Sequence, residues 1–232
     1  IEEVYDYVYY MMWEQDASFT ELMTSDLVFP KTDDLAEIYG TTKWNGDYSP
    51  ESLIRAPADE RAGLLTRAQF LFSGTNSTRA IIRGVHFYRN YLCQSIPTPA
   101  DNATPDNAVF EDHFSGRETI QAMTEIEGSS CYGCHKSIVN PLAFTFETYD
   151  PFGKFRNQED IYYPEGNAQE GQVLTTKPVN SHTEVSMNGI YEGSAPDAVS
   201  LIREVSTSGA ANLCFDMKVV GFALKQDVTY GN

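Results

Sequence analysis

Residues 131–135 read Cys-Tyr-Gly-Cys-His, and this pentapeptide constrains the fold more than any other part of the sequence. The spacing C-x-x-C-H is the attachment sequence of c-type haem. On one helical turn, Cys131 and Cys134 can both join one edge of the porphyrin, and His135 then lies beneath the iron as its proximal ligand. We therefore expect one covalent haem c, bound by Cys131, Cys134 and His135.

Two other kinds of site use a Cys-x-x-Cys pair. A zinc site needs four ligands, and the sequence contains no second Cys-x-x-Cys or His-x-x-x-His pair to complete them. A thioredoxin-like redox pair or a structural disulfide is the stronger alternative. It leaves the adjacent His135 unexplained, however, and no βαβ pattern surrounds the motif.

The two other cysteines are Cys93 and Cys214. Haem is attached to such motifs outside the cytoplasm, so we expect a periplasmic or extracellular protein. In that oxidising compartment, Cys93 and Cys214 are predicted to form a disulfide that closes a loop of about 120 residues and stabilises the fold by roughly 3–5 kcal/mol. Two independent buried thiols are the alternative.

Charge and hydropathy narrow the choice of partners. The chain has 232 residues and a formal net charge of −17, which disfavours binding to nucleic acid and to anionic membranes. No run of 18 apolar residues occurs, so no membrane span is expected. The chain begins at Ile1 without Met or a signal segment, and we expect it to be a processed or excised piece of a larger protein.

Helical periodicity and capping signals predict a mainly α fold. Ser18 and Glu21 form a capping box, and Thr32 and Gly40 bracket a short helix. The predicted helices cover residues 2–15, 18–23, 33–39, 77–92, 115–125, 194–206 and 211–224, with a further one starting at residue 66. Residues 157–195 are polar and rich in Gly, and are expected to be loops with at most a small β-hairpin near residues 185–191.

A stretch rich in Pro, Asn and acidic residues divides the chain at 96–112. We expect a helical subdomain at 1–95, this linker, and an irregular helical, cytochrome c-like haem domain with long loops at 113–232.

Several segments together are similar to a known family. They are Arg61-Ala62-Gly63-Leu64-Leu65-Thr66, Arg83-Gly84, Leu92-Cys93-Gln94, the block from Cys131 through Asn140-Pro141-Leu142-Ala143-Phe144 to Arg156, and Cys214 with Phe222-Ala223-Leu224. These segments resemble a family of domains of unknown function that occur in large secreted cytochrome-like proteins of planctomycetes, myxobacteria and marine gammaproteobacteria. The resemblance implies covalent haem, and it implies no single reaction.

The sixth iron ligand is open to several interpretations. Many relatives carry His shortly before the motif, where this chain has Met123. Met123 is therefore our first candidate for the distal ligand. Met187 and His182 are the main alternatives, and His113 or an open coordination position remain. A Met ligand would raise the reduction potential relative to His.

Pro141, Phe144 and Arg156, which all follow the motif in the sequence, are expected to complete the haem site. The carbonyl of Pro141 is predicted to accept the Nδ1–H of His135 and orient the ring. Arg156 is predicted to pair with a haem propionate, or alternatively with Glu147 or Asp150. Phe144 is expected to form part of the pocket wall, although a plain core would contain the same residue.

These features predict an electron carrier, not an enzyme. We expect a single-electron transfer module that meets a basic redox partner protein, and possible partners include other haem subunits and further copies in a homo-oligomer or filament. One alternative is a haem peroxidase or dehydrogenase subunit. The other is a non-catalytic binding or scaffold module of a secreted carbohydrate-processing protein, with exposed aromatic residues that contact sugar.

Overall fold

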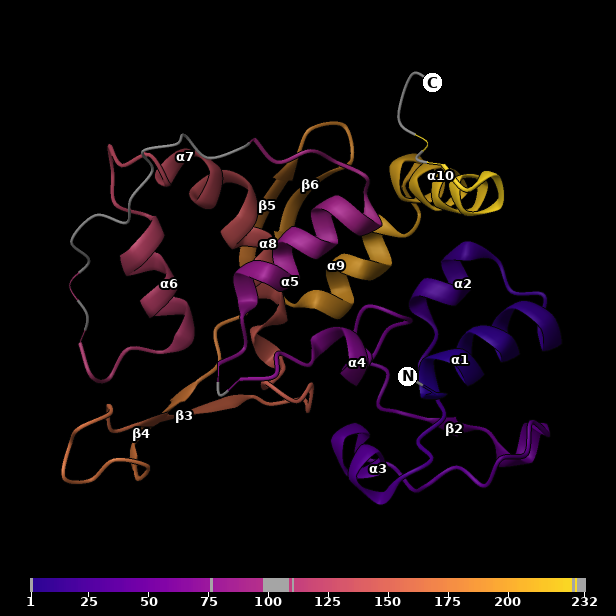
Figure 1. Ribbon diagram of the computed structural model, residues 1–232, viewed down its shortest axis with the longest axis horizontal. Coiled ribbons are helices and arrows are strands. Elements are labelled where there is room, and N and C mark those ends of the chain that lie inside the picture. Colours follow the sequence, from indigo (N-terminus) through magenta and orange to yellow (C-terminus); the bar gives the residue numbers. More distant parts are fainter. Residues whose placement is uncertain (1, 76, 98–108, 110, 227, 229–232) are drawn as a thin grey trace.

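The computed structural model describes residues 2–75, 77–97, 109, 111–226 and 228, and Figure 1 shows the arrangement of its elements. The helical segments are α1 (Glu2–Tyr9), η1 (Tyr10–Glu14), α2 (Phe19–Thr24), α3 (Asp33–Tyr39), η2 (Pro50–Ser52), α4 (Ala68–Leu71), α5 (Ala80–His86), η3 (Phe87–Tyr91), α6 (Gly116–Thr124), α7 (Tyr132–Cys134), η4 (His135–Val139), α8 (Asn140–Thr145), η5 (Phe146–Thr148), α9 (Ala198–Val205) and α10 (Gly209–Leu224). The strands are β1 (Leu27–Val28), β2 (Ile54–Arg55), β3 (Gln158–Tyr162), β4 (Val173–Pro178), β5 (Thr183–Met187) and β6 (Tyr191–Ala195). Segments η1, η3 and η4 are π-helical turns, and η2 and η5 are 3-10 turns.

The prediction of a mainly α fold is wrong. About 45% of the described residues are helical and 13% are strand, and these strands form three two-stranded antiparallel sheets, β1–β2, β3–β4 and β5–β6. The fold is mixed α/β. Within residues 157–195, β5–β6 is the small hairpin expected near residues 185–191, whereas β3–β4 forms where only loops were expected.

The two hairpins differ in how clearly the sequence marks them. In β5 the first, third and fifth residues are buried and the two between them are exposed, which is the period of a half-buried strand. In β3 and β4 only Ile161 is buried, so the strands carry no apolar alternation that a sequence pattern could reveal. Backbone pairing between β3 and β4, which follow each other in the chain, forms this other hairpin.

The helix ends at Ser18, Thr32 and Gly40 follow the expected capping chemistry. Both halves of the capping box are present at Ser18 and Glu21, and Thr32 accepts a hydrogen bond from the backbone of Leu35. Gly40 ends α3 with φ +64°, a conformation that favours glycine. The start of α9 differs from the prediction: Asp197 is the N-cap, because the residues before it belong to β6.

The main hydrophobic core draws residues from both sides of the predicted linker. Tyr7 and Phe87 pack in the same cluster as Leu142 and Ile202. Most of the linker, residues 98–108 and 110, lies outside the described residues. The division into subdomains therefore stays a prediction.

Helices α5 and α8 pack in direct backbone contact at Gly84. A Cβ built on Gly84 would lie 2.7 Å from the backbone N of Ala143 and 2.8 Å from the carbonyl oxygen of Val139. The neighbouring Arg83 is buried and donates to backbone carbonyls, among them that of Tyr149 at 2.9 Å. Together, Gly84 and Arg83 fix the position of α8, which continues the helix that carries the Cys-x-x-Cys-His motif.

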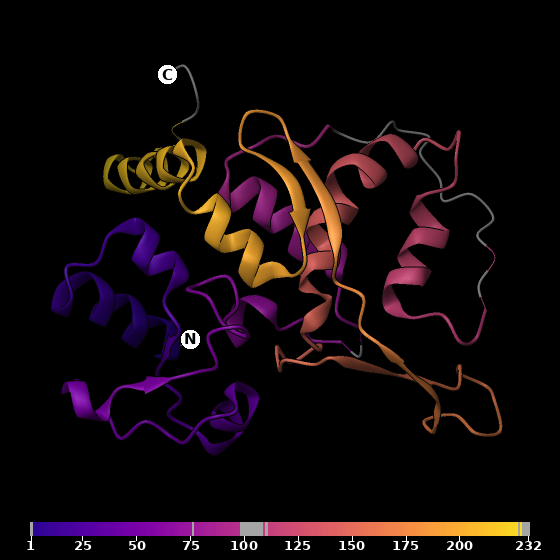
Figure 2. The ribbon, with the colours of Figure 1, turned by 180° about the vertical axis from the view of Figure 1, so that it is seen from behind.

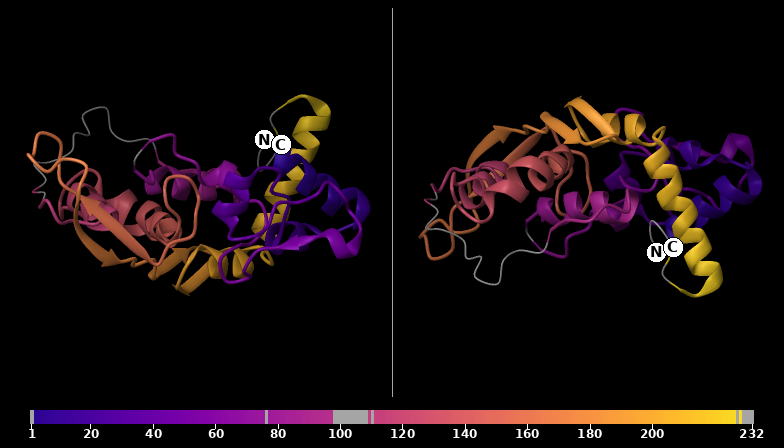
Figure 3. Two further views of the ribbon diagram at one scale, coloured as in Figure 1. Left: turned by 90° about the horizontal axis from the view of Figure 1, so that it is seen from below. Right: turned by 90° about the horizontal axis from the view of Figure 1, so that it is seen from above.

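The elements are spread along one long axis. Helices α6 and α7 lie at one end and α1 to α3 at the other, with α5, α8 and α9 between them (Figures 1 and 2). Seen from below and from above, α10 crosses the molecule and projects beyond the body (Figure 3). Among the described residues, none of the helices combines the length and apolar character that crossing a membrane requires.

Candidate functional site

The Cys-x-x-Cys-His motif lies at the start of a continuous helical segment. Cys131 is the N-cap of α7, and α7 passes without a break through the π-helical turn η4 into α8. Both Cys131 and Cys134 are half-buried free thiols that are not joined to each other. The two sulfur atoms therefore belong to one helical turn and are available for covalent attachment.

The imidazole of His135 is hydrogen-bonded at one nitrogen. Its Nδ1 lies 3.0 Å from Oδ1 of Asn140. The amide nitrogen of Asn140 is 2.9 Å from Oε1 of Glu125 and 2.9 Å from Oγ1 of Thr124. An ionised carboxylate only accepts hydrogen bonds, so the end of the Asn140 amide that faces Glu125 must be the NH₂ group. The amide oxygen then faces His135.

This amide orientation determines which ring nitrogen of a neutral His135 carries the proton. Because Oδ1 of Asn140 can only accept, Nδ1 of His135 must carry the proton. In a neutral ring with this tautomer the lone pair is on Nε2, and Nε2 makes no hydrogen bond to another described residue. A neutral imidazole with Nδ1–H bonded and Nε2 free is the form that binds a metal ion.

The π-helical turn brings His135 and Asn140 together. In a π-helix the backbone hydrogen bond closes between residues i and i+5, so the residue five positions on lies above the first. The backbone N–H of Asn140 donates to the carbonyl of His135 in this way. In a regular α-helix, residues five apart face different directions, which is why the sequence pattern did not reveal Asn140. The structure thus gives Nδ1 a side-chain acceptor, whereas we expected the carbonyl of Pro141.

The carboxylate of Glu125 is part of the same network. Lys136 lies 2.6 Å from its Oε2, and the side chain of Glu125 is only 10% exposed. Burial works against ionisation, but the hydrogen bonds from Asn140 and Lys136 outweigh it and hold the pKa of Glu125 below its usual range. Thr124 and Glu125 lie at the C-terminal end of α6, so the network also ties α6 to His135.

Phe144 and Arg156 occupy different surroundings. Phe144 is buried on α8, and the guanidinium of Arg117 from α6 lies 4.4 Å from its ring centroid. Arg156 pairs with Glu147 at 3.0 Å and with Glu159 at 3.6 Å. It immediately precedes β3, which lies at the opposite end of α8 from α7 (Figure 1). The structure therefore does not bring Arg156 to the motif, and it shows the alternative pairing with Glu147.

The candidates for the distal ligand lie in three different environments. Met123 is on the last turn of α6 and is 38% exposed. Met187 is buried in the main core at the end of β5. His182 is exposed before β5, with its Nε2 2.7 Å from Oγ of Ser194. Met123 is the candidate next to Thr124, which binds Asn140.

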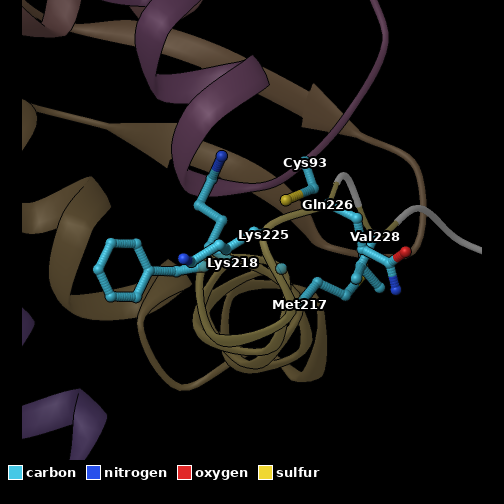
Figure 4. Close-up of a pocket in the computed structure, with 8 residues that line it drawn as sticks. Cys93, Met217, Lys218, Lys225, Gln226 and Val228 are labelled. Atoms are coloured by element: carbon cyan, nitrogen blue, oxygen red, sulfur yellow. The ribbon is translucent and has the colours of Figure 1, made fainter.

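Cys93 and Cys214 form a disulfide, with an S–S distance of 2.08 Å, as predicted. It joins the end of the α5–η3 helix to α10 across 121 residues of sequence. A surface cavity of about 470 Å³ lies beside Cys93, lined by the C-terminal half of α10 (Figure 4). Lys218, Lys225 and Phe222 contribute to its walls. This cavity contains no residue of the Cys-x-x-Cys-His motif.

The donor set suits a haem better than a bare metal ion. Within the part of the chain that the structure describes, no three His, Cys, Asp or Glu side chains converge as a metal ion requires. Cys131, Cys134 and His135 share one turn without meeting at a point, whereas covalent haem needs two sulfurs at the ring edge and one imidazole beneath the iron. The three residues, with Nδ1 of His135 already bonded, fit that arrangement.

Comparisons with known proteins give one match. No curated protein and no solved structure matches the chain. The resemblance to a domain family of unknown function is confirmed for less than half of the chain. A family model, PSCyt3, described as a protein of unknown function (DUF1588), matches residues 61–159, which include the whole Cys-x-x-Cys-His motif.

Proposed function

We propose that this protein is an extracytoplasmic c-type cytochrome module that transfers single electrons through one covalently bound haem. The observation that carries the proposal is the hydrogen bond between His135 and Asn140, because it leaves Nε2 of His135 free to bind iron.

The residues of the motif would hold the group in three ways. Cys131 and Cys134, both free and on one turn, would provide two thioether links. His135 would provide the proximal ligand through Nε2. When bound, the haem supplies an iron centre that gains and loses one electron.

The residues around His135 prepare the imidazole for this role. Asn140 holds the ring in one orientation and, by accepting from Nδ1, makes the imidazole a stronger electron donor toward a metal. Glu125 and Thr124 accept from the amide of Asn140 and keep its oxygen toward the ring. This chain of hydrogen bonds ends at the Lys136 ammonium on the surface.

The distal ligand and the compartment are parts of the same proposal. Met123, on the helix that precedes the motif, is the proposed sixth ligand. The disulfide between Cys93 and Cys214 supports a periplasmic or extracellular location, where disulfides persist. The net charge of −17 favours a basic redox partner protein.

Intact mass and visible spectra test the proposal. We expect protein made in a host that attaches c-type haem to gain the mass of one haem and to keep its colour after acid-acetone extraction. The double variant C131A/C134A should lose the covalent haem, whereas the matched control C93S/C214S should retain it. A colourless protein with both motif thiols free would overturn the proposal. High-spin iron that reacts with peroxide would favour the peroxidase alternative instead.

A further inference from the structure

Three aromatic side chains form a row on the solvent side of the first helix. Tyr5, Tyr9 and Trp13 are spaced four residues apart, and consecutive ring centroids are 6.5 and 6.2 Å apart with interplanar angles of 15° and 9°. Tyr5 is 70% exposed and Trp13 is 69% exposed. We call these three residues the aromatic row. It lies at the end of the molecule opposite α7 (Figures 1 and 3).

The row is held in place and is separate from the core. Tyr7 and Tyr10 on the opposite face of the helix are buried and supply the core contacts of this segment. The central ring, Tyr9, packs on Tyr48 at 5.6 Å, and its hydroxyl donates to Glu14 at 2.9 Å. The rings are therefore prearranged, so a partner would meet them without first having to order them.

Carboxylates surround the row with little compensating positive charge. Glu2, Glu14 and Asp16 are exposed on the same segment. Lys31 lies 3.8 Å from Glu2 and 2.7 Å from Asp6. Neither Glu14 nor Asp16 forms an ion pair with another described residue. The surface thus combines exposed aromatic residues with uncompensated negative charge, and both attract cations.

We propose that the aromatic row is a docking surface for an extended cationic segment of another protein, with Arg or Lys at alternate positions. In an extended chain, side chains on one face recur every second residue, roughly 6.4–6.8 Å apart. This repeat is close to the ring spacings of 6.5 and 6.2 Å, so successive cations can meet successive rings. Glu14 and Asp16 supply the charge complementarity that selects a basic segment over a neutral or acidic one.

This inference does not depend on haem. The row and the motif lie at opposite ends of the molecule (Figure 1), so a segment bound to the row would tether a partner without covering the motif. The variant C131A/C134A, which cannot attach haem covalently, should therefore bind such a segment as the unmodified chain does. Mass and spectra test the haem proposal and peptide binding tests the docking proposal, so either proposal can fail while the other holds.

Two synthetic peptides of equal composition test the proposal. One has the alternating sequence Arg-Ser-Arg-Ser-Arg-Ser-Arg, and the other groups its four Arg before its three Ser. We expect fluorescence anisotropy at low ionic strength to show tighter binding of the alternating peptide, and added salt should weaken it. The variant Y5A/W13A should bind this peptide about tenfold more weakly, because two ring faces are lost.

An exposed aromatic residue elsewhere provides the control. Phe222 on α10 is 88% exposed, so F222A should leave peptide binding unchanged. Y5A/W13A removes only exposed rings and should keep the circular dichroism spectrum of the unmodified chain. Equal binding of the two peptides, or of the alternating peptide by Y5A/W13A and the unmodified chain, would overturn the proposal. So would a dimer that Y5A/W13A dissociates, or binding of a neutral polysaccharide in place of the peptide.

Discussion

The amide oxygen of Asn140 lies 3.0 Å from Nδ1 of His135, one π-helical turn along the same helix. The partner of Asn140 on its other side is a carboxylate, Glu125, so the direction of every hydrogen bond between Glu125 and His135 is determined. A backbone carbonyl would also orient the ring, but it could not be removed by mutation. Because the acceptor is the side chain of Asn140, a substitution at this position tests its effect on His135.

The first prediction concerns N140L. Without its acceptor, the imidazole of His135 becomes a weaker electron donor, which disfavours the ferric state, so the reduction potential should rise. Thr124 and Glu125 lose a buried donor, and the free energy of unfolding should fall by about 1–3 kcal/mol. Potentiometric titration and urea unfolding measure the two effects. N157L, at an exposed position, is the control, and an unchanged potential in N140L would contradict the assigned role.

The second prediction concerns the distal ligand. In M123L the thioether is removed from α6, so the haem iron should change from six-coordinate low-spin toward five-coordinate high-spin. M187L alters a buried core residue and should leave the spin state unchanged while changing stability by less than about 1.5 kcal/mol. Visible spectra of both oxidation states distinguish the two variants. If M187L alone changes the spin state, Met187 and not Met123 is the ligand.

The third prediction concerns the contact between α5 and α8. G84A places a methyl group 2.7 Å from the backbone N of Ala143, so the two helices must separate. We expect a loss of about 1–3 kcal/mol in unfolding free energy, even though Ala is the better helix former. G209A, at the start of α10 with open space around it, should be neutral or slightly stabilising. Thermal unfolding of both variants checks this, and equal melting temperatures would contradict the close packing.

The fourth prediction concerns pH. Burial raises the pKa of Glu147 to about 7, which Arg156 opposes and Glu159 reinforces. Its Oε1 also has no hydrogen-bond partner among the described residues. In the unfolded chain the carboxyl has a pKa of about 4.5. Between pH 4.5 and about 7, the carboxyl of Glu147 is therefore protonated in the folded state and mostly ionised in the unfolded state. The free energy of unfolding should fall as pH rises through this interval, by at most about 1.4 kcal/mol per pH unit.

The variant E147Q isolates this contribution. Because Gln does not titrate, the slope of stability against pH over that interval should be shallower in E147Q than in the unmodified chain. Urea unfolding at several pH values across the interval provides the measurement. Parallel slopes for the two proteins would show that Glu147 is ionised throughout.

The fifth prediction concerns the disulfide. The bond between Cys93 and Cys214 spans 121 residues, so removing it restores much freedom to the unfolded chain. C93S/C214S should lose about 4–5 kcal/mol of unfolding free energy. The urea midpoint of the unmodified chain should fall in the presence of a thiol reductant, and that of C93S/C214S should not. Insensitivity of the unmodified chain to reductant would contradict a stabilising role.

Local signals in the sequence were enough for the features that depend on neighbours in the chain. The capping residues Ser18 and Thr32 predicted helix starts, because caps bond to backbone groups three residues away. Gly40 predicted a helix end, since it adopts a left-handed conformation with little strain. The order Cys131, Cys134, His135 likewise places all three residues on one turn whatever surrounds them.

Features that no local sequence pattern marks were decided by the tertiary structure. The hairpin β3–β4 has hardly any buried side chain to mark it, and Asn140 meets His135 only because the helix adopts a π turn there. Arg156 was expected to pair with a propionate or, alternatively, with Glu147 or Asp150, and it pairs with Glu147, a carboxyl group that packing has buried. The sequence alone therefore determined the local helices and the chemistry of the motif. Packing decided the partners of buried polar groups, because a buried charge or amide must be satisfied by whichever group the fold places beside it.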